Sequence, residues 1–426
     1  MGAPRFGILM SRRCKGYRMP ARLVVLKNGL KVVLVPCEAE SIAFGLFIAS
    51  GSRHESAANA GISHFIEHML FKGTPSRRAV DITRAIEGRG GNFNAFTSEE
   101  STCYYAHLPQ EYLADAIETL SDMYLNASIP DDDFVREKQV VIEEIRMYSD
   151  EPDSVAAENL QRALFPKCAL GAPVAGTPES LAAMQPSTLR RYIRSHYLPS
   201  KTIAVIAGGF DESAALALVE LYLGRRRGRG DFEADGVDFS TPPVAETFAA
   251  KDVNQTQIAL GYRTFGIRNP LKYAATVMDA VLGRGMSSRL FQEVRERRGL
   301  SYDISSRMQF FSDSGMFAVA AGLDASKKQT TIKTIDREFA RICDKKVGAA
   351  ELNRTKEYLV GNFRLGHESV KSKMFFYGST MLSFGRLVSP AEQVAGIAAV
   401  TAADVQAAAR AILRPENRSL SVVARS

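Results

Sequence analysis

Two histidines and a glutamate fall within five consecutive positions of the stretch GISHFIEHMLFKGT, residues 61–74. His64 and His68 are four residues apart, so on an α-helix their imidazoles would lie one turn apart on the same face. Glu67 is three residues from His64, which brings its carboxylate toward that face. Two imidazoles beside a carboxylate could hold a divalent metal and supply a base for hydrolysis. The alternative is that ordinary hydrogen bonds within a core helix satisfy both histidines.

A catalytic zinc site usually takes three protein ligands, so a third must come from elsewhere in the chain. The segment DDFVREKQVVIEEIRMYSD, residues 132–150, offers Glu137, Glu143 and Glu144. Glu137 and Glu144 are seven residues apart, two turns along one helical face, whereas Glu143 is rotated away from that line. Glu144 could therefore ligate the metal while Glu137 hydrogen-bonds a ligand. Taken alone, the segment favours solvated surface glutamates.

The composition is that of an ordinary globular protein, because 46% of the 426 residues are hydrophobic and 24% are charged. No apolar run approaches the ~20 residues that a membrane span requires, so we expect no membrane partner. Five scattered cysteines form neither a CxxC site nor a disulfide framework, which indicates a reducing compartment. Part of the net charge of +7 comes from Arg225, Arg226, Arg227 and Arg229. No nucleic-acid-binding motif accompanies them, and we expect no nucleic-acid partner.

The first 223 residues predict antiparallel strands mixed with clustered helices, which is an α+β pattern rather than alternating βαβ units. Asn28-Gly29 separates two β-branched runs, which predicts a hairpin over 22–36. Further strands are expected at 42–52, in a pair over 91–109, and at 202–210. Helices are expected at 62–72, 81–90, 110–127, 131–149 and 154–164.

Residues 224–245 break all periodicity with Gly, Pro and charge, as linkers do. Beyond them we expect a strand at 254–264, helices at 271–282 and 285–299, two strands over 302–322, two long helices and a terminal strand from 418. This order repeats that of the first half and suggests a duplicated domain. The predicted organisation is an extension over 1–22, a metal-binding half over 23–223, the linker over 224–245, and a second half over 246–426.

The run HFIEH matches the inverted zinc motif of the inverzincins. Its surroundings, SRHESAANAGISHFIEHMLFKGT, GGNFNAFTSEESTCYYAHLP and REKQVVIEEIRM, resemble the pitrilysin and mitochondrial-processing-peptidase family of zinc peptidases. The resemblance spans residues 23–420. The family's third zinc ligand is a glutamate some 75 residues beyond the second histidine. Because 75 residues lie between His68 and Glu144, the resemblance favours Glu144 over Glu143.

The resemblance implies an α+β fold in which two related halves, each an antiparallel sheet covered by helices, enclose a cleft. It also implies one zinc ion per chain, held by His64, His68 and Glu144, and a zinc-dependent endopeptidase that hydrolyses extended, unfolded peptides. Zinc would lower the pKa of its bound water, and Glu67 would take the proton of that water and pass it to the leaving amine.

Further residues of the resemblance lie outside the zinc motif. Arg295 and Tyr302 in EVRERRGLSY match the family's arginine–tyrosine pair, in which the tyrosine donates to the tetrahedral oxyanion and the arginine holds the substrate or the tyrosine. The segment Asn94, Ala95 and Phe96 resembles the edge strand whose backbone pairs with the peptide substrate. A surface helix end is the plainer explanation of the arginine–tyrosine pair.

The presence of the zinc motif and the arginine–tyrosine pair in one chain suggests a homodimer or a self-sufficient enzyme. Residues 1–37 contain no Asp or Glu and are rich in arginine, as transit peptides are, but they are poor in serine. We therefore expect a cytoplasmic protein, with the mitochondrial matrix as the alternative. The alternative function is a catalytically silent structural or processing-complex subunit of the same family, which the intact His64, Glu67, His68 and Glu144 disfavour.

Overall fold

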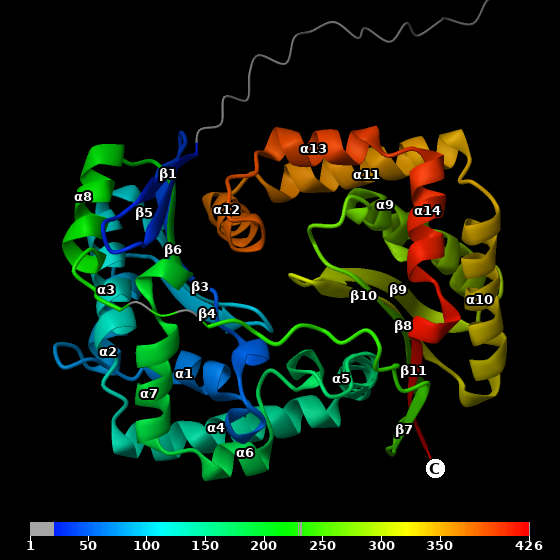
Figure 1. Ribbon diagram of the computed structural model, residues 1–426, viewed down its shortest axis with the longest axis horizontal. Helices are drawn as coiled ribbons and strands as arrows, with labels where there is room; N and C mark the ends of the chain where they lie inside the picture. The colour runs from blue at the N-terminus through cyan, green and yellow to red at the C-terminus, as the bar shows by residue number, and fades with distance from the viewer. Residues whose placement is uncertain (1–20, 229, 231, 426) are drawn as a thin grey trace, which may run out of the picture.

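The computed structural model describes residues 21–228, 230 and 232–425, and the expected extension over 1–22 lies almost entirely outside them. The chain forms two α+β halves, each built on one sheet with helices against it (Figure 1). The strand order of the first sheet is β1-β2-β6-β3-β5-β4. Its strands are β1 (Arg22–Val25), β2 (Lys31–Pro36), β3 (Ser41–Ile48), β4 (Asn92–Thr97), β5 (Thr102–Pro109) and β6 (Thr202–Gly208).

The expected hairpin at the start of the chain is present, with β1 and β2 antiparallel. Gly29 has φ +91°, a conformation that glycine adopts without the strain of a side chain, and the Asn28 Oδ1 accepts a 3.1 Å hydrogen bond from the Leu30 backbone N–H. β4 has a single neighbour, β5, and therefore forms an edge of the sheet. This edge is where the segment Asn94–Phe96 was expected to lie.

The second sheet has the strand order β7-β11-β8-β10-β9. The expectation of purely antiparallel sheets was wrong in one detail, because β2 pairs with β6 and β7 pairs with β11 in parallel. Each parallel pair joins an early strand to a late one, and the long stretch of helices and other strands between them supplies the crossover that parallel pairing requires. The strands are β7 (Glu246–Ala250), β8 (Thr256–Phe265), β9 (Ser301–Phe310), β10 (Ser314–Leu323) and β11 (Arg418–Ala424).

Helices of the first half pack their apolar residues against one face of the first sheet. The helix predicted around HFIEH buries Ile62, Phe65, Ile66, Met69 and Leu70, which explains why its polar residues lie on a narrow stripe. The helices of this half are α1 (Ile62–Leu70), α2 (Ala79–Glu87), α3 (Leu113–Asn126), α4 (Asp131–Asp150), α6 (Pro178–Ala183), α7 (Pro186–His196) and α8 (Glu212–Leu223).

Each half also packs one of its helices against the sheet of the other half (Figure 1). α5 (Pro152–Leu164) packs Leu160 and Leu164 against Ala259 and Val423 of the second sheet. In the reverse direction, α12 (Val370–Phe384) packs onto β3 and β6 of the first sheet. Every residue of β6 is buried, so the first sheet needs cover on both faces. The sequence boundaries at 223 and 246 therefore do not separate two independent cores.

The second half contains more helices than the two expected after its central strands. Ser369 and Ser389 cap new helices with their side chains, and Gly385 ends α12 in the left-handed conformation, so the helical stretch is divided. The helix predicted over 285–299 includes a π-helical segment, η6 (Phe291–Glu296). The remaining helices are α9 (Lys272–Gly283), α10 (Lys328–Asp344), α11 (Ala349–Gly366), α13 (Pro390–Ala399) and α14 (Ala402–Ile412).

The linker over 224–245 was expected to lack regular structure, and its described part contains no helix or strand. No helix within the described residues combines the length and apolar character needed to cross a membrane.

Candidate metal centre

The start of α1 is anchored by Glu55, a half-buried carboxylate that was not among the expected site residues. Gly61, at the N-cap, has φ +89°. The two carboxylate oxygens of Glu55 accept 2.7 Å hydrogen bonds from the backbone N–H groups of Gly61 and Ser63. These are two of the N–H groups that a helix leaves without intrahelical partners, so Glu55 fixes the first turn of α1, in which His64 directly follows Ser63.

The imidazoles of α1 and one carboxylate of α4 converge on a common point. The Oε2 of Glu144 lies 3.7 Å from the Nε2 of His64 and 3.4 Å from the Nε2 of His68. All three potential ligand atoms lie within 4.8 Å of one another. Two atoms bound to one tetrahedral zinc at ~2.0–2.1 Å would be separated by roughly 3.3 Å. Both the spacing and the donor types therefore fit a catalytic zinc site.

The other nitrogen of His68 has a carboxylate partner. The Oε2 of Glu137 lies 3.2 Å from the Nδ1 of His68, and the Nζ of Lys72 lies 2.6 Å from the Oε1 of Glu137. A carboxylate at Nδ1 orients the ring so that Nε2 faces Glu144, where a metal would bind, and this is the contact expected of Glu137. Lys72, four residues beyond His68 on the same side of the chain, was not predicted and holds this carboxylate in place.

His64 differs from His68 in its surroundings. Its Nδ1 is buried and has no hydrogen-bond partner among the described residues. Burial and the neighbouring His68 lower the pKa of His64 to about 4. Neutral imidazole is the form that binds a metal, so the burial of this ring favours a ligand role.

Glu67 lies beside the three ligand candidates and is held by one hydroxyl. The Oγ1 of Thr97, the last residue of β4, donates a 2.5 Å hydrogen bond to the Oε2 of Glu67. Burial raises the pKa of Glu67, and the hydrogen bond from Thr97 opposes that shift. Sequence reasoning missed Thr97, although strand alternation places it on the same face as Ala95.

The edge strand β4 presents two different faces. Phe93 and Ala95 pack against the core that includes α1, whereas Asn94 and Phe96 are exposed on the opposite face. The backbone of β4 is free to pair along the edge that β5 does not occupy. The location of Asn94, Ala95 and Phe96 is therefore compatible with peptide pairing, and their substrate role stays a prediction.

Arg295 and Tyr302 lie far from the metal centre of the same chain. The guanidinium of Arg295 stacks over the Tyr302 ring at 4.8 Å, and 76% of the Tyr302 surface is exposed. The opposite end of β9 is the one that reaches the first half, where the Nε2 of Gln309 donates to Glu99 at 3.2 Å. Seven residues of strand separate Tyr302 from Gln309, roughly 23 Å at ~3.3 Å per residue. The structure therefore groups the zinc-motif residues and leaves this pair outside that group.

Comparisons with known proteins place this geometry in a family. Residues 31–178 match the family model described as insulinase (peptidase family M16), and residues 183–359 match the peptidase M16 inactive domain. An uncharacterized zinc protease of Bacillus subtilis is 34% identical over 401 residues, which cover 94% of this chain and 97% of that protein. The chain belongs to peptidase family M16.

Family M16 membership confirms the resemblance drawn from the motifs. An uncharacterized zinc protease of Mycobacterium bovis is 36% identical over 398 residues, covering 92% of this chain and 90% of its own. A protease from Helicobacter pylori of known structure superimposes with a TM-score of 0.89 at 21% identity, over 95% of this chain and 99% of that one. That likeness confirms the fold of two helix-covered sheets. Among the described residues no further set of three His, Cys, Asp or Glu side chains converges closely enough to hold a metal.

Glu144→Gln is expected to lower zinc affinity much more than Glu143→Gln. Glu144 faces both imidazoles, whereas Glu143 is exposed and pairs with Arg146 at 2.5 Å. Glu137→Gln is expected to cost ~10–100-fold in zinc affinity or activity, because it supports a ligand rather than the metal. Competition against a fluorescent zinc chelator measures all three affinities. Equal affinities for the Glu143 and Glu144 variants, or the reverse order, would contradict the role of Glu144 as the third zinc ligand.

A second expectation concerns Glu55 and pH. Burial raises the pKa of Glu55 from 4.5 to about 7, against the opposing hydrogen bonds from Ser63 and Gly61. Because the folded state then holds the proton more tightly than the unfolded chain, the free energy of unfolding falls as pH rises from 4.5 to 7 and is level above. Glu55→Gln removes this dependence.

Urea unfolding of wild type and Glu55→Gln at about pH 5 and about pH 7.5 measures the effect, which is on the order of 2–3 kcal/mol between the two conditions. Taking the difference between the two proteins cancels pH effects that they share. The exposed Glu143→Gln is the control and should follow wild type. If the free energy of unfolding changed with pH in the same way in wild type and in Glu55→Gln, Glu55 would not be the group responsible for the pH dependence.

Proposed function

We propose that this protein is a zinc-dependent endopeptidase that hydrolyses extended, unfolded peptides. The observation that carries the proposal is the convergence of His64, His68 and Glu144 beside a half-buried fourth residue, Glu67, that is not needed as a ligand. A bound zinc ion would polarise the scissile carbonyl and lower the pKa of a water molecule. The single cluster of this kind among the described residues supports a stoichiometry of one zinc per chain.

The residues of the chain supply the proton transfers and the orientation. Glu67 Oε2 is occupied by the Thr97 hydroxyl, which leaves Oε1 to take a proton from the attacking water. The same carboxyl then donates that proton to the nitrogen of the leaving amine as the peptide bond breaks. An extended peptide paired with β4 would lie beside α1, since β4 packs against that helix. Backbone pairing of this kind requires an unfolded substrate and little sequence specificity.

The second half is proposed to complete the active site of a second copy of the chain in a homodimer. Arg295 and Tyr302 lie at the end of β9 away from its contact with the first half, so we infer that they do not act on the candidate zinc ligands of their own chain. In a two-fold dimer each second half faces the partner's first half, so an exposed pair can enter the neighbouring cleft. There Tyr302 would donate to the oxyanion and Arg295 would hold the tyrosine or the substrate.

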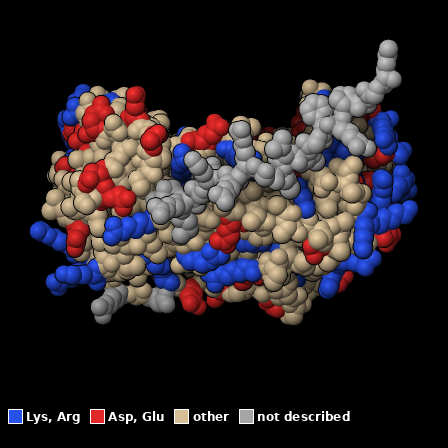
Figure 2. Space-filling model, turned by 90° about the horizontal axis from the view of Figure 1, so that it is seen from above, with Lys and Arg blue, Asp and Glu red and all other residues tan. Residues whose placement is uncertain are grey.

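The charge of the two halves supports this pairing. Residues 21–223 carry 26 acidic and 18 basic side chains, whereas residues 246–426 carry 17 acidic and 27 basic side chains. Figure 2 shows Lys and Arg gathered at the outer end of the second half, on the right. An antiparallel two-fold association places the acidic half of each copy against the basic half of the other, which favours the encounter and fixes its orientation.

Metal removal and a digest test the function together. Chelation is expected to abolish cleavage of an unstructured peptide, and stoichiometric zinc should restore it, with products identified by mass spectrometry. A folded protein of similar size should remain intact in the same assay.

Bound zinc without cleavage of any unstructured peptide would favour the catalytically silent subunit instead. Binding to DNA that weakens with salt, without hydrolysis, would favour the nucleic-acid partner that we do not expect.

The cytoplasmic location also remains a proposal. The relatives described above are bacterial proteins, which favours the cytoplasm over the mitochondrial matrix. Fractionation of cells that express the full chain would test it.

A further inference from the structure

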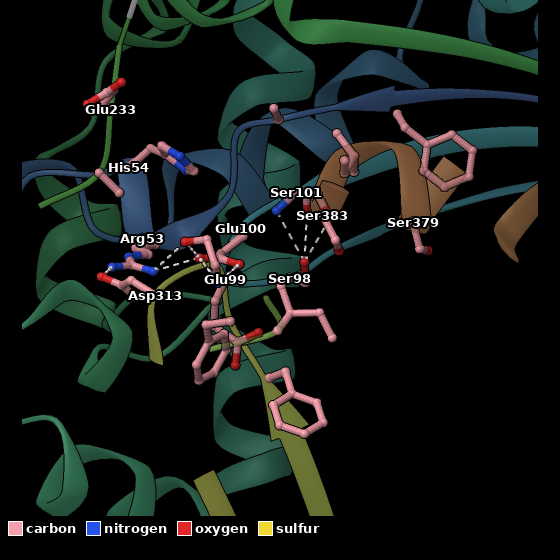
Figure 3. Close-up of a pocket in the computed structure, with 18 of the residues that line it drawn as sticks. Arg53, His54, Ser98, Glu99, Glu100, Ser101, Glu233, Asp313, Ser379 and Ser383 are labelled. Atoms are coloured by element: carbon pink, nitrogen blue, oxygen red, sulfur yellow. Dashed lines mark hydrogen bonds and ion pairs between the residues drawn. The ribbon is translucent and has the colours of Figure 1, made fainter. Parts of the chain in front are cut away.

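A single buried arginine joins three separate segments of the chain close to the edge strand (Figure 3). Arg53 lies in η1 (Ser52–His54), between β3 and α1, and its side chain is only 2% exposed. Its Nη1 donates to the Oε1 of Glu100 at 2.6 Å and to the Oγ of Ser312 at 3.1 Å. Its Nη2 donates to the Oδ2 of Asp313 at 2.6 Å and to the carbonyl of Asp235 at 3.0 Å. The guanidinium thus contacts the β4–β5 turn, the linker and the β9–β10 turn.

The partners of Arg53 are also bonded to one another. The Glu100 carboxylate accepts hydrogen bonds from the backbone N–H of Ser312 at 2.9 Å and from its hydroxyl at 2.6 Å. The Oδ2 of Asp313 accepts a 3.0 Å hydrogen bond from the backbone N–H of Val237. Removing the guanidinium would leave two carboxylates close together without their cation, which is costly in a partly buried site. The cluster therefore holds the tips of two turns, one from each half, in fixed contact.

The turn held by this cluster directly follows β4, the edge strand that lies beside α1. Thr97, which bonds Glu67, is the last residue of β4 and lies three positions before Glu100. The backbone N–H of Arg53 also donates to the carbonyl of Glu99 at 2.7 Å. A Cβ at Gly51 would lie 2.1 Å from the carbonyl oxygen of Ser98, so η1 and the turn approach as closely as backbone permits. Arg53 therefore holds the turn through its backbone and its side chain.

We propose that Arg53 is a positioning residue, which sets the place of β4 and of the Thr97–Glu67 hydrogen bond by tying the β4–β5 turn to the second half and the linker. The proposal rests on the endopeptidase function proposed above. It gives the second half two separate roles. Within its own chain the second half supports the edge strand through Ser312 and Asp313, and in the partner's active site it supplies the arginine–tyrosine pair.

The test compares Arg53→Lys with wild type in the full-length, zinc-loaded protein. Lysine keeps the charge but cannot contact all three segments at once, because it lacks the planar fork. Misplacing a catalytic group by ~1 Å can cost about 10²-fold in rate, so kcat is expected to fall by roughly 10–100-fold while zinc content is unchanged. Arg78→Lys is the matched control, since Arg78 pairs with Asp81 in the same half on the exposed surface.

Hydrogen exchange of the amides over 92–101 provides a readout that does not need activity. Arg53→Lys is expected to speed exchange in this segment, while exchange in α3 stays as in wild type. If Arg53→Lys does not fold, Ser312→Ala replaces it as the test variant, because this change removes only the hydroxyl contacts to Arg53 and Glu100. Ser312→Ala should also speed hydrogen exchange over 92–101, but by less than Arg53→Lys.

The two proposals fail in different ways. Wild-type protein without hydrolysis would contradict the endopeptidase function, yet faster exchange over 92–101 in Arg53→Lys would still support the tie between Arg53 and the turn. A folded Arg53→Lys protein with kcat within twofold of wild type and unchanged exchange over 92–101 would overturn the positioning role. A lowered melting temperature alone, with both of those readouts unchanged, would also overturn it.

Discussion

Glu67→Gln is expected to retain zinc and lose peptide hydrolysis. Glutamine has nearly the same shape and can still accept the Thr97 hydrogen bond at its amide oxygen, so the local packing is preserved. It cannot take a proton from water or deliver one to the leaving nitrogen. General acid–base catalysis contributes roughly 10²–10⁴-fold, and Glu67 serves both transfers, so a loss at the upper end of that range is expected.

Steady-state cleavage of a quenched fluorescent peptide, with zinc measured on the same samples, tests the role of Glu67. Glu143→Gln is the matched control, because it makes the same change on an exposed residue of the neighbouring helix α4. Its rate should equal that of wild type. A Glu67→Gln protein that binds zinc fully and cleaves the peptide at the wild-type rate would contradict the role of Glu67 as the general base.

Tyr302→Phe is expected to lower kcat by roughly 10²–10³ without changing zinc content, because one oxyanion donor is worth ~2.7–4 kcal/mol in the transition state. The ring and its stacking with Arg295 remain, so folding should be unaffected. Arg295→Ala should weaken substrate binding or catalysis and also leave zinc in place. Tyr302→Phe with an unaltered kcat would make the pair structural.

Mixing the two inactive variants decides which chain supplies the tyrosine. In a dimer of one Glu67→Gln chain and one Tyr302→Phe chain, the site with the intact Glu67 would receive the intact Tyr302 from the partner. Random exchange of subunits should then restore roughly a quarter of the wild-type rate, because half of the dimers are mixed and each has one complete site. Tyr302 acting within its own chain predicts no recovery, since neither chain would hold both residues.

The sequence alone determined the local part of the metal site. His64, Glu67 and His68 share a helical face because they belong to one turn, and the burial of Phe65, Ile66 and their neighbours makes that turn helical. The same periodicity separated Glu144 from Glu143, and the family spacing agreed with it. The edge position of β4 followed from the resemblance and is present in the sheet order.

Only the tertiary structure decided the contacts that join distant segments. The bond from Thr97 to Glu67, the anchoring of α1 by Glu55 and the cluster around Arg53 each join groups whose sequence separation carries no periodic signal. The packing of α5 and α12 across the two halves has the same cause. Both faces of a sheet with buried central strands need cover, and the amphipathic periodicity of a helix shows its apolar face but not which sheet that face covers.

The position of Tyr302 shows the same limit. Its spacing from Arg295 is local, and the resemblance implied that the arginine holds the substrate or the tyrosine. The distance of Tyr302 from His64, His68 and Glu144 depends on the direction in which β9 runs across the second sheet. That direction is fixed by long-range strand pairing and by the packing of the two halves, which only the folded chain determines.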